Sequence, residues 1–206
     1  MANENGSKSD RTRERILHAA AKEFRGSGYA LTSLRQIADN AGMQAGSLYY
    51  HFANKDELVE AVLDEGVLGA QRAASAAIEA LDDDANPLEK IGAAFSGHLA
   101  YTLEEADFAV ATLRMLHQVP DAVRIRHLRK QRAYGRFYAK LFEEAKQQKL
   151  IRDEFNLSAL RMLLLGALNW SPEWYDPSGL TPDQLVRQLT AMMESGVMPR
   201  SKGRSA

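Results

Sequence analysis

The 206-residue sequence contains no cysteine, which excludes a disulfide framework, a thiolate metal site and a cysteine nucleophile. No apolar run approaches the roughly 20 residues that a membrane-spanning helix requires, and the first ten residues, MANENGSKSD, lack the apolar stretch of a signal peptide. A Gly-rich phosphate loop and a Gly-x-Ser-x-Gly motif are also missing. We therefore expect a soluble cytoplasmic protein that is not an enzyme and carries no cofactor.

The histidines offer no metal site either. His18, His98, His117 and His127 lack the close carboxylate or histidine spacing that is typical of metal ligands. We interpret them as ordinary packing or polar residues.

Alternating runs of β-branched residues, the pattern of strands, are missing, and the sequence contains no internal repeat. A hydrophobic content of 45% with 26% charged residues is typical of a globular chain that folds. Helix start signals occur throughout, among them Ser9 as an N-cap and capping boxes at Ser33, Asn54 and Thr181. We predict an all-α protein of about nine helices with solvated tails at MANENGSKSD and PRSKGRSA.

The charge is distributed unevenly along the chain. Residues 1–55 contain eight Lys and Arg residues against five acids, a net charge of +3, although the whole chain carries −1. The remainder therefore carries −4. A basic N-terminal module on an acidic body suggests contact with a polyanion, but a solvated surface explains so small an excess equally well.

The segment GMQAGSLYYHF, residues 42–52, indicates where this contact lies. As a helix it places Leu48 and Phe52 on one face and leaves its Gly, Ser, Tyr and His residues around the rest. A helix from Ser9 to about Gly26 and a second helix of two turns precede it, and a tight turn at Gly42 separates it from the second. This is the geometry of a helix-turn-helix.

Residues 31–58, LTSLRQIADNAGMQAGSLYYHFANKDEL, resemble the DNA-binding domain of the TetR family of bacterial transcriptional regulators. The family pattern is matched by Thr32, Ile37-Ala38, Ala41-Gly42, Gly46, Tyr49, His51-Phe52, Lys55 and Leu58. The resemblance implies a DNA-binding domain over 1–55 and a ligand-binding and dimerisation domain over 56–206.

The resemblance also implies which residues meet double-stranded DNA, since the second helix of the motif enters the major groove. Phosphate contacts are expected from Ser33, Ser47, His51 and Lys55, and contacts to base edges or nearby backbone from Arg35, Gln44, Tyr49 and Tyr50. Relatives often have larger groups at Ala45 and Gly46, so few residues read bases directly. Two alternatives stay open at this point. Gly46 could be a glycine that allows helices to pack closely, and Lys55 could be an ordinary exposed lysine without a function.

In the family, the last two helices of two subunits form a four-helix dimer interface. Apolar stripes suited to such a seam are Leu160, Leu164, Ala167 and Leu168 in one helix and Leu185, Leu189, Met192 and Met193 in the other. The same residues would also suit an intramolecular core. A symmetric homodimer predicts a near-palindromic operator.

A cationic stretch precedes these helices: residues 122–142 contain seven Lys and Arg residues and no acid, so the rest of 56–206 carries −11. With its interleaved aromatic residues this basic band suits an anionic effector, although a solvated helix face is an equal alternative. The segment GALNWSPEWYDPSGLT is similar to TetR-family repressors of fatty-acid and steroid catabolism that respond to acyl-CoA thioesters. The resulting ligand-site hypothesis comprises Arg129, Arg132, Tyr134, Phe137, Tyr138, Asn169, Trp170 and Trp174. Alternatively, the aromatic residues Trp170, Trp174 and Tyr175 could pack in the dimer interface or in the core.

These observations predict a homodimeric, ligand-responsive repressor that acts without a membrane partner. Two alternatives stay open: a multidrug-type repressor with an apolar pocket, and a helical small-molecule-binding protein without DNA function. The basic band argues against the first, and a strong effect of Tyr49→Ala on DNA binding would exclude the second.

Overall fold

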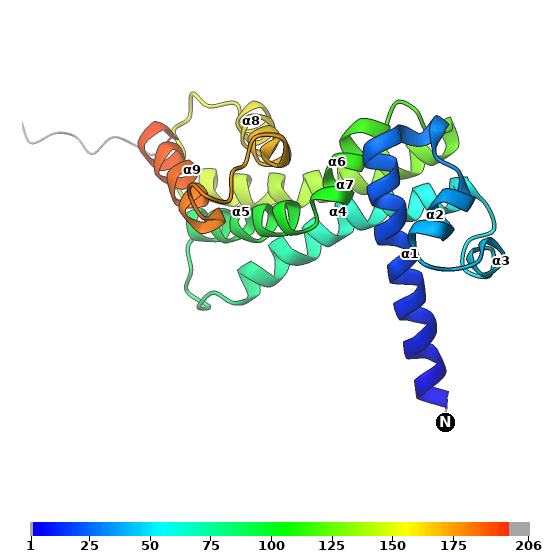
Figure 1. Ribbon diagram of the computed structural model, residues 1–206. Helices are drawn as coiled ribbons and strands as arrows, with labels where there is room; N and C mark the ends of the chain where they lie inside the picture. Colours follow the sequence, from blue (N-terminus) through cyan, green and yellow to red (C-terminus); the bar gives the residue numbers. More distant parts are fainter. Residues whose placement is uncertain (1, 198–206) are drawn as a thin grey trace, which may run out of the picture. The chain divides into compact units, whose positions relative to one another are not determined.

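The structure is a computed structural model that describes residues 2–197, with side chains from residue 8 onward. Within that range it is all-α, as predicted, with nine α-helices and one 3-10 helix (Figure 1). The elements are α1 (Ala2–Leu31), α2 (Leu34–Asn40), α3 (Ala45–Leu48), α4 (Lys55–Glu79), α5 (Pro87–Glu104), α6 (Ala106–Met115), α7 (Asp121–Gln147), α8 (Leu157–Asn169), the 3-10 helix η1 (Ser171–Glu173) and α9 (Pro182–Val197).

The chain forms two compact units. The first consists of the residues up to Leu68 together with Glu105–Gln131, and the second of Gly69–Glu104 together with the residues from Arg132 onward. Two long helices, α4 and α7, therefore contribute to both units. The functional division at residue 55 remains a prediction.

The first unit is built on the apolar stripe of α1. Ile16, Ala20 and Phe24 recur at intervals of four residues and are fully buried. They pack with residues from the following helices, including Ile37, Leu48, Phe52, Leu58, Val62, Phe108, Ala111 and Met115. This core joins α6 to the three N-terminal helices, so the positions of α2 and α3 are fixed by a common set of apolar contacts.

The capping residues set most helix starts. Ser33 forms the predicted capping box with Gln36: its hydroxyl accepts the Gln36 N–H at 3.2 Å, and its own N–H donates to Gln36 Oε1 at 2.9 Å. Thr181 and Gln184 form the same pair ahead of α9. Asn54 accepts the Glu57 N–H at 2.9 Å, while the Glu57 carboxylate accepts the N–H of Ala53, one residue earlier than predicted.

The start of α1 differs from the prediction. The helix begins at Ala2, so Ser9 lies inside it and is not an N-cap, and the segment predicted as an N-terminal tail is helical. At the other end, Gly28 takes φ 73° and kinks the helix, which continues to Leu31 beyond it. The predicted C-terminal tail lies outside the described residues.

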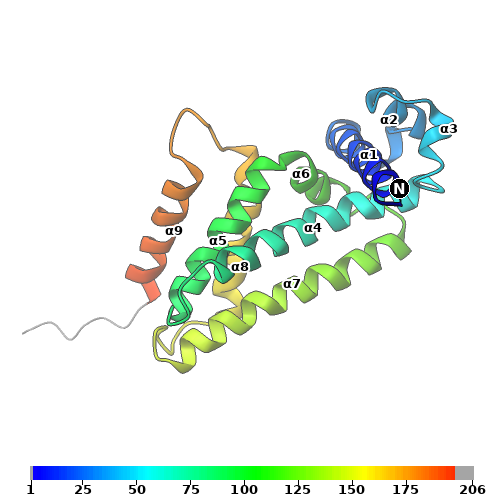
Figure 2. The same ribbon diagram turned by 90° about the horizontal axis from the view of Figure 1, so that it is seen from below.

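In the second unit, α8 and α9 both pack against α5 (Figure 2). Its core includes the stacked rings of Phe95 and Tyr138, whose centroids are 5.5 Å apart, and the ring of Phe142. No helix in the described part of the chain combines the length and apolar character needed to cross a bilayer.

Candidate nucleic-acid interface

The turn between α2 and α3 depends on Gly42. This residue has φ +65°, a conformation that L side chains rarely adopt. Its N–H donates to the carbonyl of Asp39 at 3.1 Å, and the next N–H, of Met43, donates to the carbonyl of Ala38 at 3.0 Å. Both bonds satisfy carbonyl groups at the end of α2, and the chain turns directly into α3.

The recognition segment is one helical turn, Ala45–Leu48, followed by turns through His51, and is shorter than the helix predicted there. It is held at two points, as expected: Leu48 and Phe52 are 0% and 1% exposed, and the Phe52 N–H donates to the Leu48 carbonyl at 3.0 Å. The two buried side chains therefore fix which face of the segment is turned to solvent.

Aromatic side chains project from that outer face. Tyr49 is 56% exposed and Tyr50 94%, which is unusual for such large rings unless they serve a contact. Of the other predicted DNA-contacting residues, Ser33, Arg35, Gln44, Gly46 and Ser47 are exposed, and Ala45, His51 and Lys55 are half-buried.

Gly46 has no packing role in the described chain. A Cβ atom added there would meet no heavy atom within 4 Å, so no neighbouring residue requires the absence of a side chain. The backbone at Gly46 is therefore open to solvent, as it also is at Gly26 and Gly166.

Cationic groups surround the segment. The Arg13 guanidinium lies 5.0 Å from the centre of the Phe52 ring, and the Lys55 ammonium lies 4.3 Å from the centre of the Tyr29 ring. Sequence reasoning missed Arg13 and Tyr29 as parts of this surface. The available signal was the aromatic residue directly after Gly28, at the kink that ends the regular part of α1.

The described residues contain no cluster of three or more His, Asp or Glu side chains that could hold a metal ion. The proposed ligand-site residues divide into an inner and an outer group. Tyr134 and Tyr138 are buried and Asn169 is half-buried, whereas Arg129, Arg132, Trp170 and Trp174 are exposed and Phe137 is half-buried.

The inner group meets at the buried His98. The Tyr134 hydroxyl lies 2.8 Å from His98 Nδ1, and Asn169 Oδ1 lies 3.1 Å from His98 Nε2. Because an amide oxygen only accepts, Nε2 carries the hydrogen and Nδ1 is left as an acceptor. The Tyr134 hydroxyl next to Nδ1 also has the Ala70 carbonyl oxygen as an acceptor, at 3.1 Å. Tyr138 extends the network by donating to the Ala94 carbonyl at 3.1 Å. Burial lowers the pKa of His98 to about 4 and raises that of Tyr134 above its usual range.

The basic band is partly neutralised. Arg126 binds Glu60 through two nitrogens at 2.7 and 2.6 Å, Lys130 pairs with Asp64, and Arg124 pairs with Asp121 at 2.7 Å. The Arg126 contact also lowers the pKa of Glu60. Three of its seven cations thus form ion pairs in the first unit, and only the remaining part of the band presents unneutralised charge as a candidate anion site.

The residues predicted to form the dimer interface differ in their exposure to solvent. Leu168 and Met193 are buried within the chain, Ala167 and Met192 are exposed, and Leu160, Leu164, Leu185 and Leu189 are half-buried. Other apolar side chains reach solvent on the same helices, with Leu163 74% and Met162 60% exposed.

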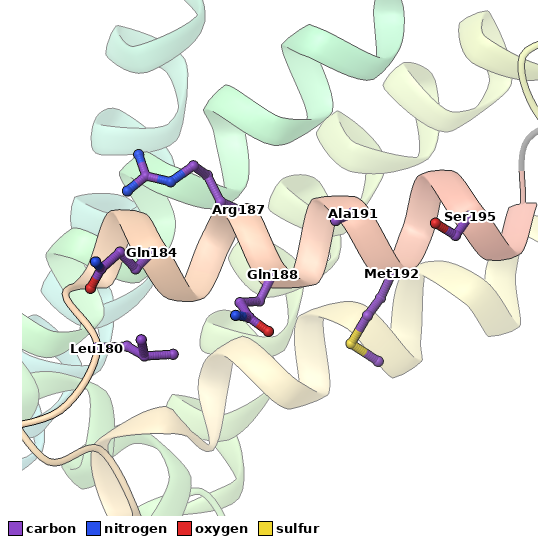
Figure 3. A pocket seen from close by; sticks show the side chains of 7 residues that line it. All are labelled: Leu180, Gln184, Arg187, Gln188, Ala191, Met192 and Ser195. Atoms are coloured by element: carbon purple, nitrogen blue, oxygen red, sulfur yellow. The ribbon is translucent and has the colours of Figure 1, made fainter.

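A groove of about 630 Å³ runs along α9 (Figure 3). Gln188 and Met192 project from α9 on one side of the helix and Arg187 on another. The lining consists of Leu180, Gln184, Arg187, Gln188, Ala191, Met192 and Ser195.

Comparison with known proteins agrees with this architecture. Residues 16–62 match the family model "Bacterial regulatory proteins, tetR family", and residues 84–197 match "Tetracyclin repressor-like, C-terminal domain". The fold and the exposed recognition segment therefore define a DNA-binding transcriptional regulator. The chain belongs to the TetR family, whose members are regulators and not enzymes.

Relatives extend over nearly the whole chain. The transcriptional repressor KstR2 of Mycolicibacterium smegmatis is 27% identical over 96% of this chain and 96% of its own. The structure of the ketosteroid transcriptional regulator KstR2 of Mycobacterium tuberculosis superposes with a TM-score of 0.78 at 23% identity, covering 91% of this chain and 95% of that one. AibR in complex with isovaleryl coenzyme A and operator DNA gives a TM-score of 0.73 at 25% identity, with coverage of 88% and 97%.

Proposed function

We propose that this protein is a homodimeric repressor that binds a near-palindromic operator through residues 33–55. One observation carries the proposal: Leu48 and Phe52 fix the recognition segment, while Tyr49, Tyr50 and Gly46 are left to solvent without a packing role. A full-length relative is named as a repressor, which favours repression. Repression on DNA places the protein in the cytoplasm.

Within this surface, Tyr49 and Tyr50 are placed to meet base edges, including thymine methyl groups, in the major groove. Ser33, Ser47, His51 and Lys55 supply hydrogen-bond donors for phosphate oxygens. Since Ala45 and Gly46 offer no hydrogen-bonding side chain, we infer that much of the specificity comes from Arg35, the tyrosines and DNA shape.

The second subunit is expected to pack on α8 and α9. Leu163, Met162 and Met192 are large apolar side chains that are exposed by more than half on these helices, and an interface with another copy would remove them from water. A two-fold dimer would set its recognition segments about 34–36 Å apart, one turn of DNA.

The effector is proposed to be an anionic, hydrophobic molecule such as an acyl-CoA thioester. The exposed Arg132 supplies positive charge and Trp170 supplies an exposed ring in the second unit. A relative of similar fold has been solved with isovaleryl coenzyme A and operator DNA. A coupling free energy of about 1–3 kcal/mol between effector and operator is enough for release.

Selection of bound sequences from a random DNA library by the purified protein, at one fixed near-physiological salt concentration, tests the DNA-binding proposal. An enriched palindrome that Tyr49→Ala binds at least tenfold more weakly would support it. Ile125→Ala is the matched control, because Ile125 is a similarly exposed apolar residue (49%) in the same unit. Absence of enrichment, or equal binding by the Tyr49 variant, would overturn it.

Titration of the protein–operator complex with isovaleryl-CoA, a long-chain acyl-CoA and a cationic dye tests the effector proposal. Release by an acyl-CoA is the expected result, weakened by Arg132→Ala and unchanged by Arg124→Ala, because the Arg124 cation is already paired with Asp121. Release by the dye alone would contradict an anionic effector.

A further inference from the structure

Tyr29 lies against the beginning of α4, the helix whose first residue is Lys55. The Lys55 ammonium lies over the face of the Tyr29 ring, 4.3 Å from its centre. On the same residue, the phenol O–H donates a hydrogen bond to an Asp56 carboxylate oxygen. Tyr29 therefore contacts both the cation and the neighbouring anion.

These two contacts have opposite consequences for an approaching phosphate. A ring face attracts the ammonium without neutralising it, so the positive charge stays available. The hydrogen bond engages one oxygen of the Asp56 carboxylate, which keeps its charge and still attracts Lys55 but has one fewer oxygen free to bind the ammonium. The hydroxyl keeps its hydrogen at neutral pH, because burial and Asp56 raise the pKa of Tyr29 to about 12.

Without the contact to Tyr29, Lys55 would be poorly held at the start of α4. A lysine in the first turn of a helix is opposed by the helix dipole, and a free lysine side chain samples many rotamers. Burial against Tyr29 also lowers the pKa of Lys55, which is the direction expected when the ammonium has lost part of its water. A partly dehydrated cation that is held in one position loses less hydration and less side-chain entropy when it binds a phosphate.

We propose that Tyr29 is a positioning residue for DNA: its ring holds Lys55 ready for a phosphate, and its hydroxyl engages one oxygen of the neighbouring Asp56. This inference rests on the proposed function, in which Lys55 binds a DNA phosphate. It adds to the interface a residue outside the helix-turn-helix segment.

A double-mutant cycle tests the inference on the full-length protein with its selected operator. Affinity is measured for the wild type, Tyr29→Leu, Lys55→Ala and the double variant at several salt concentrations. In the wild-type background we expect Tyr29→Leu to weaken binding about threefold to fivefold. In the Lys55→Ala background we expect it to have no effect, and in either single variant the salt dependence should decrease by about one phosphate contact.

Tyr29→Phe provides the conservative comparison, because it keeps the ring and removes only the hydroxyl. It should retain the wild-type salt dependence, with a smaller loss of affinity from the released Asp56. Thermal unfolding of every variant checks that each is folded at the assay temperature, and the Phe variant keeps the test informative if the Leu variant is not.

The outcomes separate the two claims. Equal losses from Tyr29→Leu with and without Lys55, or no loss in either, would overturn the positioning role. Wild-type binding that Lys55→Ala leaves unchanged would overturn the phosphate role of Lys55 and the inference with it. No DNA binding by the wild type would overturn the proposed function itself.

Discussion

Acidification should destabilise this protein through His98. In the folded chain its pKa is about 4, because the imidazole is buried, against an ordinary value of 6.5. Between these two pH values the unfolded chain binds a proton at this residue and the folded chain does not. The free energy of unfolding therefore falls as the pH drops below about 6.5, and His98 has no further effect below about 4.

The magnitude follows from the size of the shift. One pKa unit corresponds to about 1.4 kcal/mol, so the shift of His98 amounts to about 3 kcal/mol of stability present at pH 7 and lost by pH 4. That is a large fraction of the roughly 5–15 kcal/mol by which folded proteins are stable. The physical cause is burial of the imidazole, which disfavours its charged form, while the hydrogen bond with Asn169 acts in the opposite direction.

Urea unfolding at a fixed protein concentration, repeated from pH 7 to pH 4, measures the effect, since a dimer's stability depends on concentration. His98→Gln should be less stable than the wild type at pH 7 but should lose about 3 kcal/mol less on acidification. His117→Gln is the matched control, because His117 is exposed. The pKa of buried His127 is also lowered, so a residual dependence stays in both variants. Identical pH profiles for the wild type and His98→Gln would refute the reasoning.

Four further substitutions have predictable results. Gly97→Ala places a methyl group 2.2 Å from the Ala73 carbonyl oxygen and should destabilise the fold by about 1–3 kcal/mol in thermal unfolding, whereas Gly26→Ala meets no atom within 4 Å and should stabilise it slightly. Ser33→Ala removes the α2 cap and should cost about 1 kcal/mol in the same assay; an unchanged melting temperature would contradict this. Leu163→Arg should shift the protein to a monomer in light scattering, while a persisting dimer would exclude α8 from the interface.

Features determined by neighbouring residues could be predicted from the sequence. The capping box at Ser33 and the turn at Gly42 involve residues within five positions of each other, and the burial of Leu48 with Phe52 follows from helical spacing. The start of α1 could not be predicted in the same way. Once packing of residues such as Ile16 forms the helix, each added turn costs little, so a polar segment can extend it past a residue that would otherwise cap it.

Features that depend on contacts between several helices could not be predicted from the sequence. His98 was interpreted only as a packing or polar residue, because nothing local shows that its two nitrogens meet side chains 36 and 71 positions away. The contact of Tyr29 with Lys55 likewise depends on how the end of α1 meets the start of α4. Long-range pairing of this kind is set by the tertiary fold and leaves no periodic signal.

The basic band, residues 122–142, shows most clearly how tertiary contacts change the meaning of a sequence pattern. Arg126 and Lys130 are four residues apart on α7, and their partners Glu60 and Asp64 are four residues apart on α4, so two parallel ion pairs form between matching helix faces. Part of a run of like charges in the sequence thus becomes a neutralised contact in the first unit, between α7 and the helix that begins at Lys55. Such exposed pairs contribute little stability individually, but each one removes a cation from any anion site. Arg129 stays exposed in the first unit, and Arg132 is the first cation of the band in the second unit, where we expect a variant to change the response to ligand without changing operator binding.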